Sequence, residues 1–164
     1  MRLSTKARYG LRLLLDLALT GSNAPVHLQD VARRQGISKK YLEHIAAALA
    51  AQGFVRSVRG AKGGFLLAKP PPQIRVLDVV RALEGPISIT NCVTAPEVCE
   101  RSKHCVTRRL WTRVNTAVEE TLANVTLHDL VLEARAQKEF MEEYESGESQ
   151  DEQARATITA SQEQ

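Results

Sequence analysis

The chain has 164 residues, the length of one domain or of a small domain with an appendage. Hydrophobic residues make up 43% and charged residues 25%, close to ordinary globular usage, which excludes collagen-like, disulfide-scaffold and wholly disordered classes. Because only 4% of the residues are aromatic, the core must consist mainly of aliphatic side chains, as in mainly helical proteins.

The sequence gives no indication of a membrane segment. The longest apolar candidate, residues 11–19, is far shorter than the roughly 20 residues of a bilayer span and is interrupted by Arg12 and Asp16. The basic N-terminus is not followed by an uninterrupted apolar stretch with a small-residue cleavage site, so secretion is not expected. We therefore predict a cytoplasmic protein without membrane association.

The net charge of +3 is divided unevenly along the chain. Residues 1–75 contain 13 Lys or Arg and 3 Asp or Glu, a net +10, whereas residues 76–164 contain 9 and 16, a net −7. A basic half favours a polyanion such as DNA, although a merely solvated surface has the same composition. Residues 139–164 contain eight acidic residues and one Arg, which predicts an acidic, disordered tail.

The first half of the chain has the pattern of a helix-turn-helix. Apolar residues recur at helical spacing over residues 9–18, then over 28–32, and again over 41–49 after the predicted cap Ser38. A tight turn at residues 35–37, with Gly36 in its centre, separates the second and third helices, as this motif requires.

Two predicted strands, residues 54–58 and 65–68, flank a basic, Gly-rich loop at 59–64. A hairpin that follows a helix-turn-helix is a wing, and its glycines would let the backbone approach a phosphate or enter the minor groove. A nucleotide-binding loop is the alternative, but such a loop should connect a strand to a helix.

The second half is predicted to contain a linker helix up to Leu83, an irregular loop at 86–104 and a long helix. Because a long helix that projects from a small domain has few internal partners, we expect its apolar stripe to form a homodimer contact, with an intramolecular core as the alternative. The stripe consists of Leu110, Val114, Val118 and Leu122. Thr126, with Asp129 three residues later, predicts the cap of a further short helix.

The predicted fold is therefore mainly α, a winged helix-turn-helix DNA-binding domain with a small β-hairpin wing and a long dimerisation helix. Its expected parts are the DNA-binding domain with linker helix (1–85), the cysteine loop (86–105), the dimerisation helix with the short helix (106–138) and the tail (139–164).

All three cysteines, Cys92, Cys99 and Cys105, lie within 14 residues. Thiolates on one loop can bind an iron-sulfur cluster or zinc. The gaps of six and five residues are wider than the tight pairs of structural zinc sites, which favours a cluster.

Four segments together resemble the IscR family of winged-helix iron-sulfur regulators, over roughly residues 1–135. They are the opening MRLSTKARYGLRLLLDLA, the helix SKKYLEHI, the wing VRGAKGGFLLAK and the cysteine loop before CVTRRLW. The resemblance implies a cytoplasmic homodimer that binds palindromic operator DNA, regulates cluster-biogenesis genes and carries a cluster, commonly [2Fe-2S], received from the cluster-assembly machinery.

The sequence departs from that family at the fourth cluster ligand. The family's first cysteine gap is usually five residues, and its His three positions after the last cysteine is replaced by Arg108. His104 is the nearest imidazole and a weak candidate, because it directly precedes Cys105. Related nitric-oxide sensors use an acidic residue of the partner's first helix, where this chain has Arg8. Other candidates for the open position are Glu97, Glu100, Thr107 and solvent. An incompletely ligated cluster would be labile, as a sensor requires.

The predicted DNA contacts lie at the start of the recognition helix and on the wing. They are Ser38, Lys39, Lys40, Tyr41, Glu43, His44, Arg59 and Lys62. Lys39 and Lys40 would contact phosphates, Lys40 or His44 would read guanine, and Tyr41 would touch or pack on the DNA backbone. Glu43 either determines specificity, by accepting a hydrogen bond from the cytosine amino group, or forms a surface salt bridge with Lys39 or Lys40. Arg59 would enter the minor groove, with Lys62 on a flanking phosphate.

The cysteines suggest two alternative functions. A winged-helix regulator without a cluster would use the cysteines for zinc, for thiol oxidation or for a response through a partner protein. An enzyme with Cys99 and His104 as nucleophile and base is not expected, because nothing resembles a substrate site and the basic wing would be unexplained.

Overall fold

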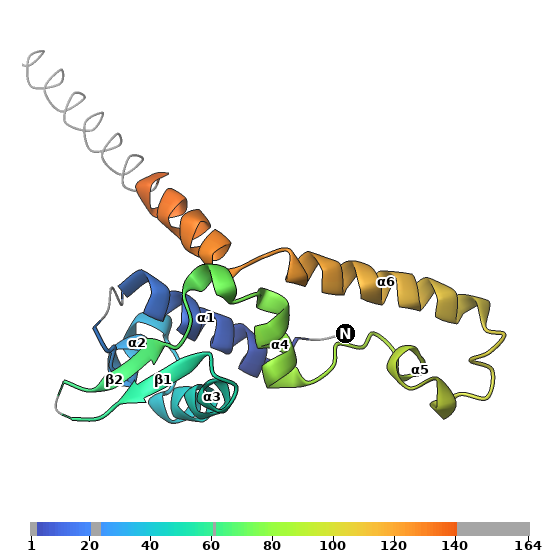
Figure 1. Ribbon diagram of the computed structural model, residues 1–164, viewed down its shortest axis with the longest axis horizontal. Coiled ribbons are helices and arrows are strands. Elements are labelled where there is room, and N and C mark those ends of the chain that lie inside the picture. The colour runs from blue at the N-terminus through green and yellow to red at the C-terminus, as the bar shows by residue number, and fades with distance from the viewer. Residues whose placement is uncertain (1–2, 21–23, 61, 141–164) are drawn as a thin grey trace, which may run out of the picture. The chain divides into compact units, whose positions relative to one another are not determined.

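The computed structural model describes residues 3–20, 24–60 and 62–140, and its chain divides into two compact units, Met1–Leu130 and Val131–Gln164 (Figure 1). The predicted acidic tail lies outside the described residues from residue 141 onward. No helix in the described ranges combines the length and the apolarity that crossing a membrane requires.

The first three helices form the predicted helix-turn-helix domain. They are α1 (Thr5–Thr20), α2 (Leu28–Gln35) and α3 (Lys39–Ala51). Gly36 ends α2 with φ at +64°, a left-handed conformation that favours glycine, and the Ile37 N–H donates to the Ala32 carbonyl. The Ser38 hydroxyl accepts from the Tyr41 N–H at 3.3 Å, so the predicted N-cap of α3 is confirmed.

The wing is a two-stranded antiparallel hairpin. Its strands are β1 (Val55–Val58) and β2 (Gly64–Leu67). Val26 and Phe65 exchange two backbone hydrogen bonds of 2.9 Å, so the segment before α2 extends the hairpin by one bridge. A Cβ on Gly63 would lie 2.3 Å from the Val58 carbonyl oxygen, and one on Gly64 would lie 2.5 Å from that of Val26. Close backbone packing within the domain therefore already requires these two glycines, a reason that the sequence prediction lacked.

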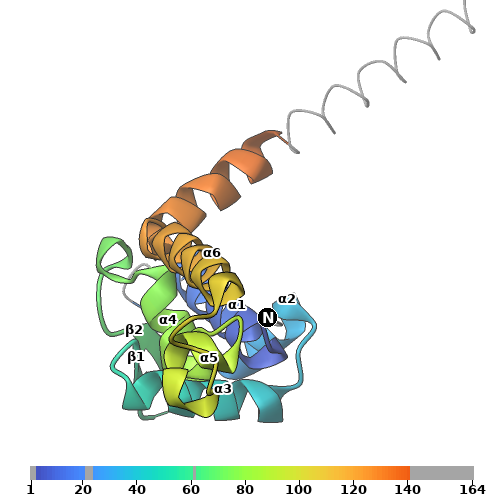
Figure 2. The same ribbon diagram turned by 90° about the vertical axis from the view of Figure 1, so that its right-hand side faces the viewer.

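A continuous aliphatic core joins α1, α2, α3, the hairpin and α4 (Val76–Glu84). Its fully buried members include Leu13, Leu14, Val31, Leu42, Ile45, Leu49 and Val79. Within the first unit, α1 and α4 lie between α3 on one side and α6 (Val106–Ala123) on the other (Figures 1 and 2). A second apolar cluster attaches the C-terminal half of α6 to α4 through Val118 and Leu122.

The segment between α4 and α6 is more regular than predicted. Residues 86–104 include two short helices, α5 (Asn91–Thr94) and the 3-10 turn η2 (Pro96–Val98), whereas a continuous irregular loop was expected. Another 3-10 turn, η1 (Pro71–Gln73), follows the wing where the three consecutive prolines begin the linker. After α6 the chain returns to α4, because the Val76 N–H donates to the Val125 carbonyl at 2.9 Å.

A further helix occupies residues 127–140. Its predicted cap is confirmed, since the Thr126 N–H donates to Asp129 at 2.8 Å and the Asp129 N–H donates back to the Thr126 hydroxyl at 3.3 Å. The prediction that this helix is short was wrong. Residues 133–139 are all favourable for helix, which extends the helix past the predicted boundary at residue 138.

Candidate nucleic-acid interface and cysteine segment

The predicted contacts on the recognition helix lie together at the start of α3. Of the six, Tyr41 is half-buried and the others are exposed: Ser38, Lys39, Lys40, Glu43 and His44. Four of them line a shallow hollow of about 470 Å³: Ser38, Lys40, Tyr41 and His44. Leu42 and Ile45 point into the core, as predicted. The start of α3 therefore presents a mixed donor and cationic surface to solvent.

Glu43 does form an ion pair on its own helix. Lys39 Nζ lies 3.5 Å from Glu43 Oε1, and both side chains are about half exposed. An exposed pair of this spacing stabilises the helix by only about 0.3–0.5 kcal/mol. Breaking it so that Lys39 or Glu43 contacts DNA instead would therefore cost little free energy. Lys40 has no ion pair within the described ranges and is the more available cation.

Tyr41 is also held by α1, which sequence reasoning did not foresee. Its hydroxyl lies 3.0 Å from the Thr5 hydroxyl, and its ring meets the Tyr9 ring edge-on at a centroid distance of 5.9 Å. The Arg12 guanidinium lies 5.5 Å from the centre of the Tyr9 ring. Contacts with Thr5 and Tyr9 of α1 therefore position the Tyr41 side chain, independently of any contact that it makes with DNA.

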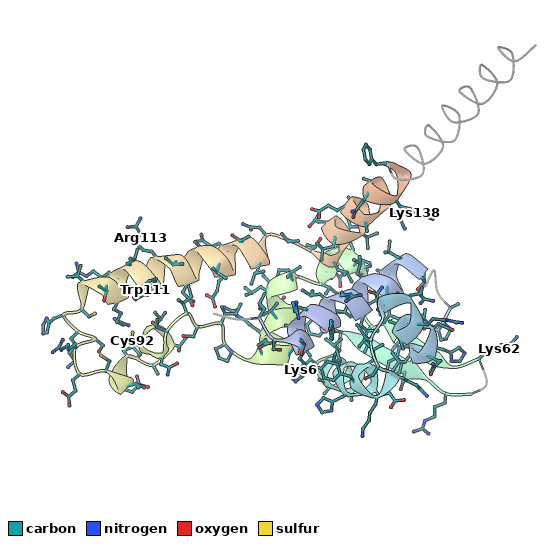
Figure 3. All side chains as sticks on the ribbon, turned by 180° about the vertical axis from the view of Figure 1, so that it is seen from behind. Lys6, Lys62, Cys92, Trp111, Arg113 and Lys138 are labelled. Carbon is teal, nitrogen blue, oxygen red and sulfur yellow. The ribbon has the colours of Figure 1, made fainter. Side chains whose placement is uncertain are left out.

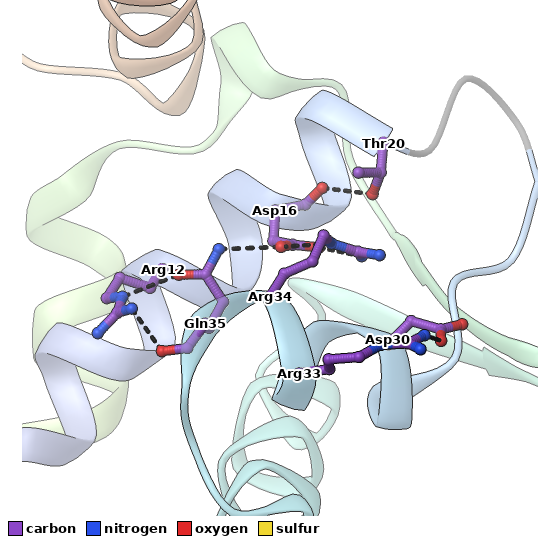
Figure 4. A network of polar contacts seen from close by, with 7 residues as sticks. All are labelled: Arg12, Asp16, Thr20, Asp30, Arg33, Arg34 and Gln35. Atoms are coloured by element: carbon purple, nitrogen blue, oxygen red, sulfur yellow. Dashed lines mark hydrogen bonds and ion pairs between the residues drawn. The ribbon is translucent and has the colours of Figure 1, made fainter.

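A buried ion pair fixes α2 against α1 (Figure 4). The Asp16 carboxylate is buried and accepts from Arg34 Nη2 at 2.6 Å, from Arg34 Nε at 3.1 Å and from Gln35 Nε2 at 2.9 Å. Burial raises the pKa of Asp16, but the hydrogen bonds from Arg34 and Gln35 and the Arg34 charge outweigh it, so the pKa is lowered overall. The sequence showed Asp16 only as an interruption of an apolar run, yet a lone acid in such a run indicates a buried carboxylate that needs a charged partner.

The wing carries its two predicted contacts at its tip. Arg59 and Lys62 are exposed, and neither forms an ion pair within the described ranges. A turn closed by the Gly63 N–H and the Gly60 carbonyl at 2.9 Å sets the tip. Figure 3 shows Lys62 at the end of the hairpin, far from α6. Both cations are thus available to an anionic partner.

The three cysteines are free, partly exposed and distributed over residues 92–105, the cysteine segment. Cys92 lies in α5, where its sulfur is 3.3 Å from the Thr90 hydroxyl. Cys99 follows η2 and lines a hollow of about 530 Å³ together with Arg108. Cys105 is the residue directly before α6, and its sulfur lies 3.1 Å from the Thr107 hydroxyl.

Arg108, which stands where the resembling family has a histidine, braces the cysteine segment. Its Nε donates to the Cys92 carbonyl at 2.7 Å and so connects α5 to the first turn of α6. Nearby, the Asn115 side-chain oxygen accepts from the Ile89 N–H at 3.1 Å. These two contacts hold the start of the cysteine segment, and the residues just before it, against α6.

The donor chemistry of the segment suits a thiophilic centre, but the thiols do not converge. Among the described residues no group of three His, Cys, Asp or Glu side chains is arranged to hold a metal ion. His104 is exposed and is not brought to the thiols in such a group. Binding one centre through Cys92, Cys99 and Cys105 would therefore require the segment to close.

The Cys105 thiol has a lowered pKa. The Thr107 hydroxyl is the main cause, followed by the Arg108 backbone N–H, with a smaller contribution from the Arg108 charge. Hydrogen bonds of this kind favour the thiolate, which is both the metal-ligating and the reactive form.

The predicted dimer stripe divides into two parts. Val118 and Leu122 pack against α4, as the intramolecular alternative proposed. Leu110 and Val114 remain exposed, together with Val106 and Trp111. Arg113 projects from the side of α6 that faces away from α5 (Figure 3). The N-terminal half of α6 thus offers an uncovered apolar surface.

Comparisons with known proteins find relatives in both sequence and structure. A family model described as Rrf2, iron-dependent transcriptional regulator, matches residues 3–133. Protein rrf2 of Nitratidesulfovibrio vulgaris is 42% identical over 134 residues, 82% of this chain and 89% of the relative. Two solved structures are similar. CymR, the global cysteine regulator of B. subtilis, has a TM-score of 0.69 and 39% identity, covering 80% of this chain and 96% of that chain. T. potens IscR has a TM-score of 0.67 and 38% identity, covering 82% and 88%.

Proposed function

The chain belongs to the Rrf2 family of transcriptional regulators, and from this premise we propose that it is an iron-sulfur-sensing regulator that binds palindromic operators as a homodimer. The family consists of DNA-binding regulators, not enzymes. One observation carries the DNA-binding proposal: the exposed cations at the start of α3 and at the wing tip belong to one winged-helix domain with a complete core. We place the protein in the cytoplasm, where the chromosome is accessible.

On DNA, the start of α3 would enter the major groove. Lys39 and Lys40 would contact phosphates, and Lys40 or His44 would reach guanine acceptors. Tyr41, whose hydroxyl already contacts Thr5, would touch or pack on the DNA backbone with its partly exposed side chain. Arg59 would occupy a narrow minor groove, while Lys62 would contact a phosphate beside it.

The wing can be tested with Arg59→Ala and, as a matched control, Arg113→Ala, which removes the same charge from an exposed position on α6. Fluorescence anisotropy with a 30-bp duplex between 50 and 200 mM salt gives the affinity and its salt slope. We expect Arg59→Ala to weaken binding and to reduce the slope by about 1, and Arg113→Ala to do neither. Identical slopes for wild type and Arg59→Ala would remove the wing from the interface.

A homodimer is supported by the exposed apolar surface of α6. Leu110 is 50% exposed and Val114 is 37% exposed, and both lie in the N-terminal half of α6, on the same stripe as Val118 and Leu122 but beyond the part that packs against α4. A second copy would bury them, and the resulting two-fold symmetry would match a palindromic operator.

Cys92, Cys99 and Cys105 would hold the cluster, most simply a [2Fe-2S] centre obtained from the cluster-assembly machinery, with cluster-biogenesis genes as the regulated targets. Support comes from the confinement of every cysteine to one segment and from the similarity to T. potens IscR. The bound centre would supply a redox-active and labile signal. A side chain near Cys105, with His104 as a weak candidate, or solvent would complete the coordination, because a guanidinium such as that of Arg108 stays protonated and cannot act as a ligand.

A second candidate is a regulator that uses the thiols directly, for zinc or for oxidation, without a cluster. The lowered pKa of Cys105 favours it, and so does the similarity to CymR, the global cysteine regulator of B. subtilis.

Visible absorption, iron content and acid-labile sulfide of anaerobically purified protein separate the two candidates. A coloured protein whose bands vanish in the triple Cys→Ala variant, but persist in Val98→Ala from the same segment, supports the cluster. Spectra of His104→Ala then test the fourth ligand. A colourless protein, with zinc or with no metal, refutes the cluster and leaves DNA binding as proposed.

A further inference from the structure

The last residue of α4 caps the first turn of α1. Glu84 Oε1 accepts a short hydrogen bond from the Ser4 hydroxyl and a second one of 3.3 Å from the Ala7 N–H. The Ser4 hydroxyl in turn accepts from the Lys6 N–H at 3.0 Å. Since the first N–H groups of a helix lack partners within it, a carboxylate at this point both satisfies donors and complements the helix dipole.

The same turn of α4 is seated tightly on α1. A Cβ built on Gly10 would lie 2.3 Å from Leu83 Cδ1, so the Leu83 methyl occupies the space that any other residue at position 10 would fill. Leu83 is buried in the main core. A shift of the C-terminal end of α4 would therefore carry the N-terminal half of α1 with it, because close-packed contacts transmit displacement.

The first turns of α1 also hold the recognition helix. Thr5, one residue after Ser4, places its hydroxyl 3.0 Å from the Tyr41 hydroxyl, and Tyr9 supports the Tyr41 ring edge-on. Tyr41 lies in the first turn of α3, in the same hollow as Lys40 and His44. One stretch of α1 thus contacts the end of α4 on one side and the proposed DNA-reading turn on the other.

Beyond Glu84, residues 85–91 connect α4 to the cysteine segment. Gly85 ends α4 with φ at +83°, and the following residues are fastened to α6 through Ile89 and Cys92. A closure of the cysteine segment would therefore pull on the end of α4.

We propose that Glu84 is a positioning residue that, through the first turn of α1 and Thr5, sets the position of Tyr41 on DNA and links it to the state of the cysteine segment. The inference rests on the proposed function. Glu84 touches neither DNA nor the thiols and acts only through α1.

The test compares Glu84→Ala with Glu120→Ala, which removes the same charge from an exposed position on α6. Affinity for a duplex DNA is measured for each, together with Thr5→Val, Tyr41→Phe and the double variants. We expect Glu84→Ala to weaken binding about fivefold, the effect of one hydrogen bond. Its effect should shrink when Thr5→Val is already present, because both changes interrupt one chain of contacts. Glu84→Gln, which keeps an acceptor oxygen, should restore part of the affinity.

Two further measurements distinguish positioning from a general loss of stability. Amide shifts of the DNA-free protein should move in residues 39–44 of Glu84→Ala, while those of the β1–β2 hairpin stay in place. The triple Cys→Ala change should alter the affinity of the wild type, in either direction, more than that of Glu84→Ala.

Additive effects of Glu84→Ala and Thr5→Val, or equal behaviour of Glu84→Ala and Glu120→Ala, would overturn the inference while DNA binding stands. An unchanged affinity after triple Cys→Ala in the wild type would overturn its link to the cysteine segment. A wild type that does not bind duplex DNA would refute the proposed function itself.

Discussion

The winged-helix region and α6 differ in how they bury apolar surface. The helices α1, α3 and α4 bury aliphatic side chains in one shared core, and α4 buries others in a second cluster. On α6 the only buried residue is Asn115, while Leu110, Trp111 and Val114 stay exposed. One region completes its own core, whereas the other leaves apolar side chains uncovered. Mutations in the first region should therefore affect folding, and mutations in the second should affect only the proposed dimer.

The largest effect should come from the core of the winged helix. Leu49 is fully buried in α3, so Leu49→Ala should lower the free energy of unfolding by about 2–5 kcal/mol through lost burial and a residual cavity. Urea denaturation measures the loss. Leu110→Ala, the same change at a half-exposed position of α6, is the control, and at concentrations where the protein is monomeric it should cost less than about 0.5 kcal/mol. Equal losses would contradict the distinction between the regions.

The Asp16–Arg34 pair tests whether α2 depends on a buried charge. Asp16→Asn should lower the free energy of unfolding at pH 7 by about 2 kcal/mol, less than for a fully buried pair because Arg34 is partly exposed. Since the pKa of Asp16 is lowered from 3.8 in the folded state, its stabilisation is present above that value and is lost as the pH falls through the folded pKa. The difference between wild type and variant should therefore vanish in strong acid.

Asp30→Asn provides the control for that measurement. Asp30 and Arg33 form an ion pair of the same two residue types, but both side chains are exposed. The expected loss in the free energy of unfolding is therefore at most about 0.5 kcal/mol. A loss for Asp16→Asn that is no larger, or that does not shrink as the pH falls below 3.8, would show that the Asp16–Arg34 pair does not stabilise α2 as the geometry indicates.

The uncovered face of α6 can be tested through the oligomeric state. Leu110→Asp would place a charge in the proposed dimer contact and should raise the dimer dissociation constant at least about tenfold, as expected for desolvating an unpaired charge. Sedimentation equilibrium measures it. Thr116→Asp adds the same charge at an exposed position of α6 outside the apolar stripe and should have little effect. If both variants dimerise like the wild type, the apolar face has another role.

The smallest effect concerns the thiol at the start of α6. Thr107→Val removes the hydroxyl that contributes most to the lowered pKa of Cys105, so that pKa should rise toward its usual value. The alkylation rate of Cys105 in the reduced, metal-free protein should then fall a few-fold at neutral pH, because less thiolate is present. Thr112→Val is the matched control, because the Thr112 hydroxyl donates to the Arg108 carbonyl and does not contact Cys105. An unchanged alkylation rate would mean that backbone N–H groups, and not the Thr107 hydroxyl, lower the pKa of Cys105.

Sequence patterns predicted the winged-helix region well and the rest only in part. The aliphatic periodicity of α1 and α3, the Ser38 cap and the Thr126–Asp129 pair are local signals, and the structure contains each of them. The family membership and the fold class are confirmed by the comparisons as well.

Contacts between elements distant in the chain were not predictable. Nothing around Thr5 or Glu84 signals that they meet Tyr41 and Ser4, because hydrogen bonds between helices depend on packing rather than on spacing. The apolar stripe of α6 was recognised, but its division between α4 and solvent depends on where α4 lies. The predicted DNA contacts and cluster ligands stay predictions, since they concern partners that a sequence does not contain.

The tight packing of Gly63 and Gly64 has a practical consequence for anyone who wishes to redesign the wing. Because the Val58 and Val26 backbones already fill the space beside these glycines, the hairpin frame cannot be varied at either position, whatever DNA is to be bound. Arg59 and Lys62 are exposed and can be exchanged freely. A library for retargeting should therefore randomise the two cations and keep the two glycines fixed.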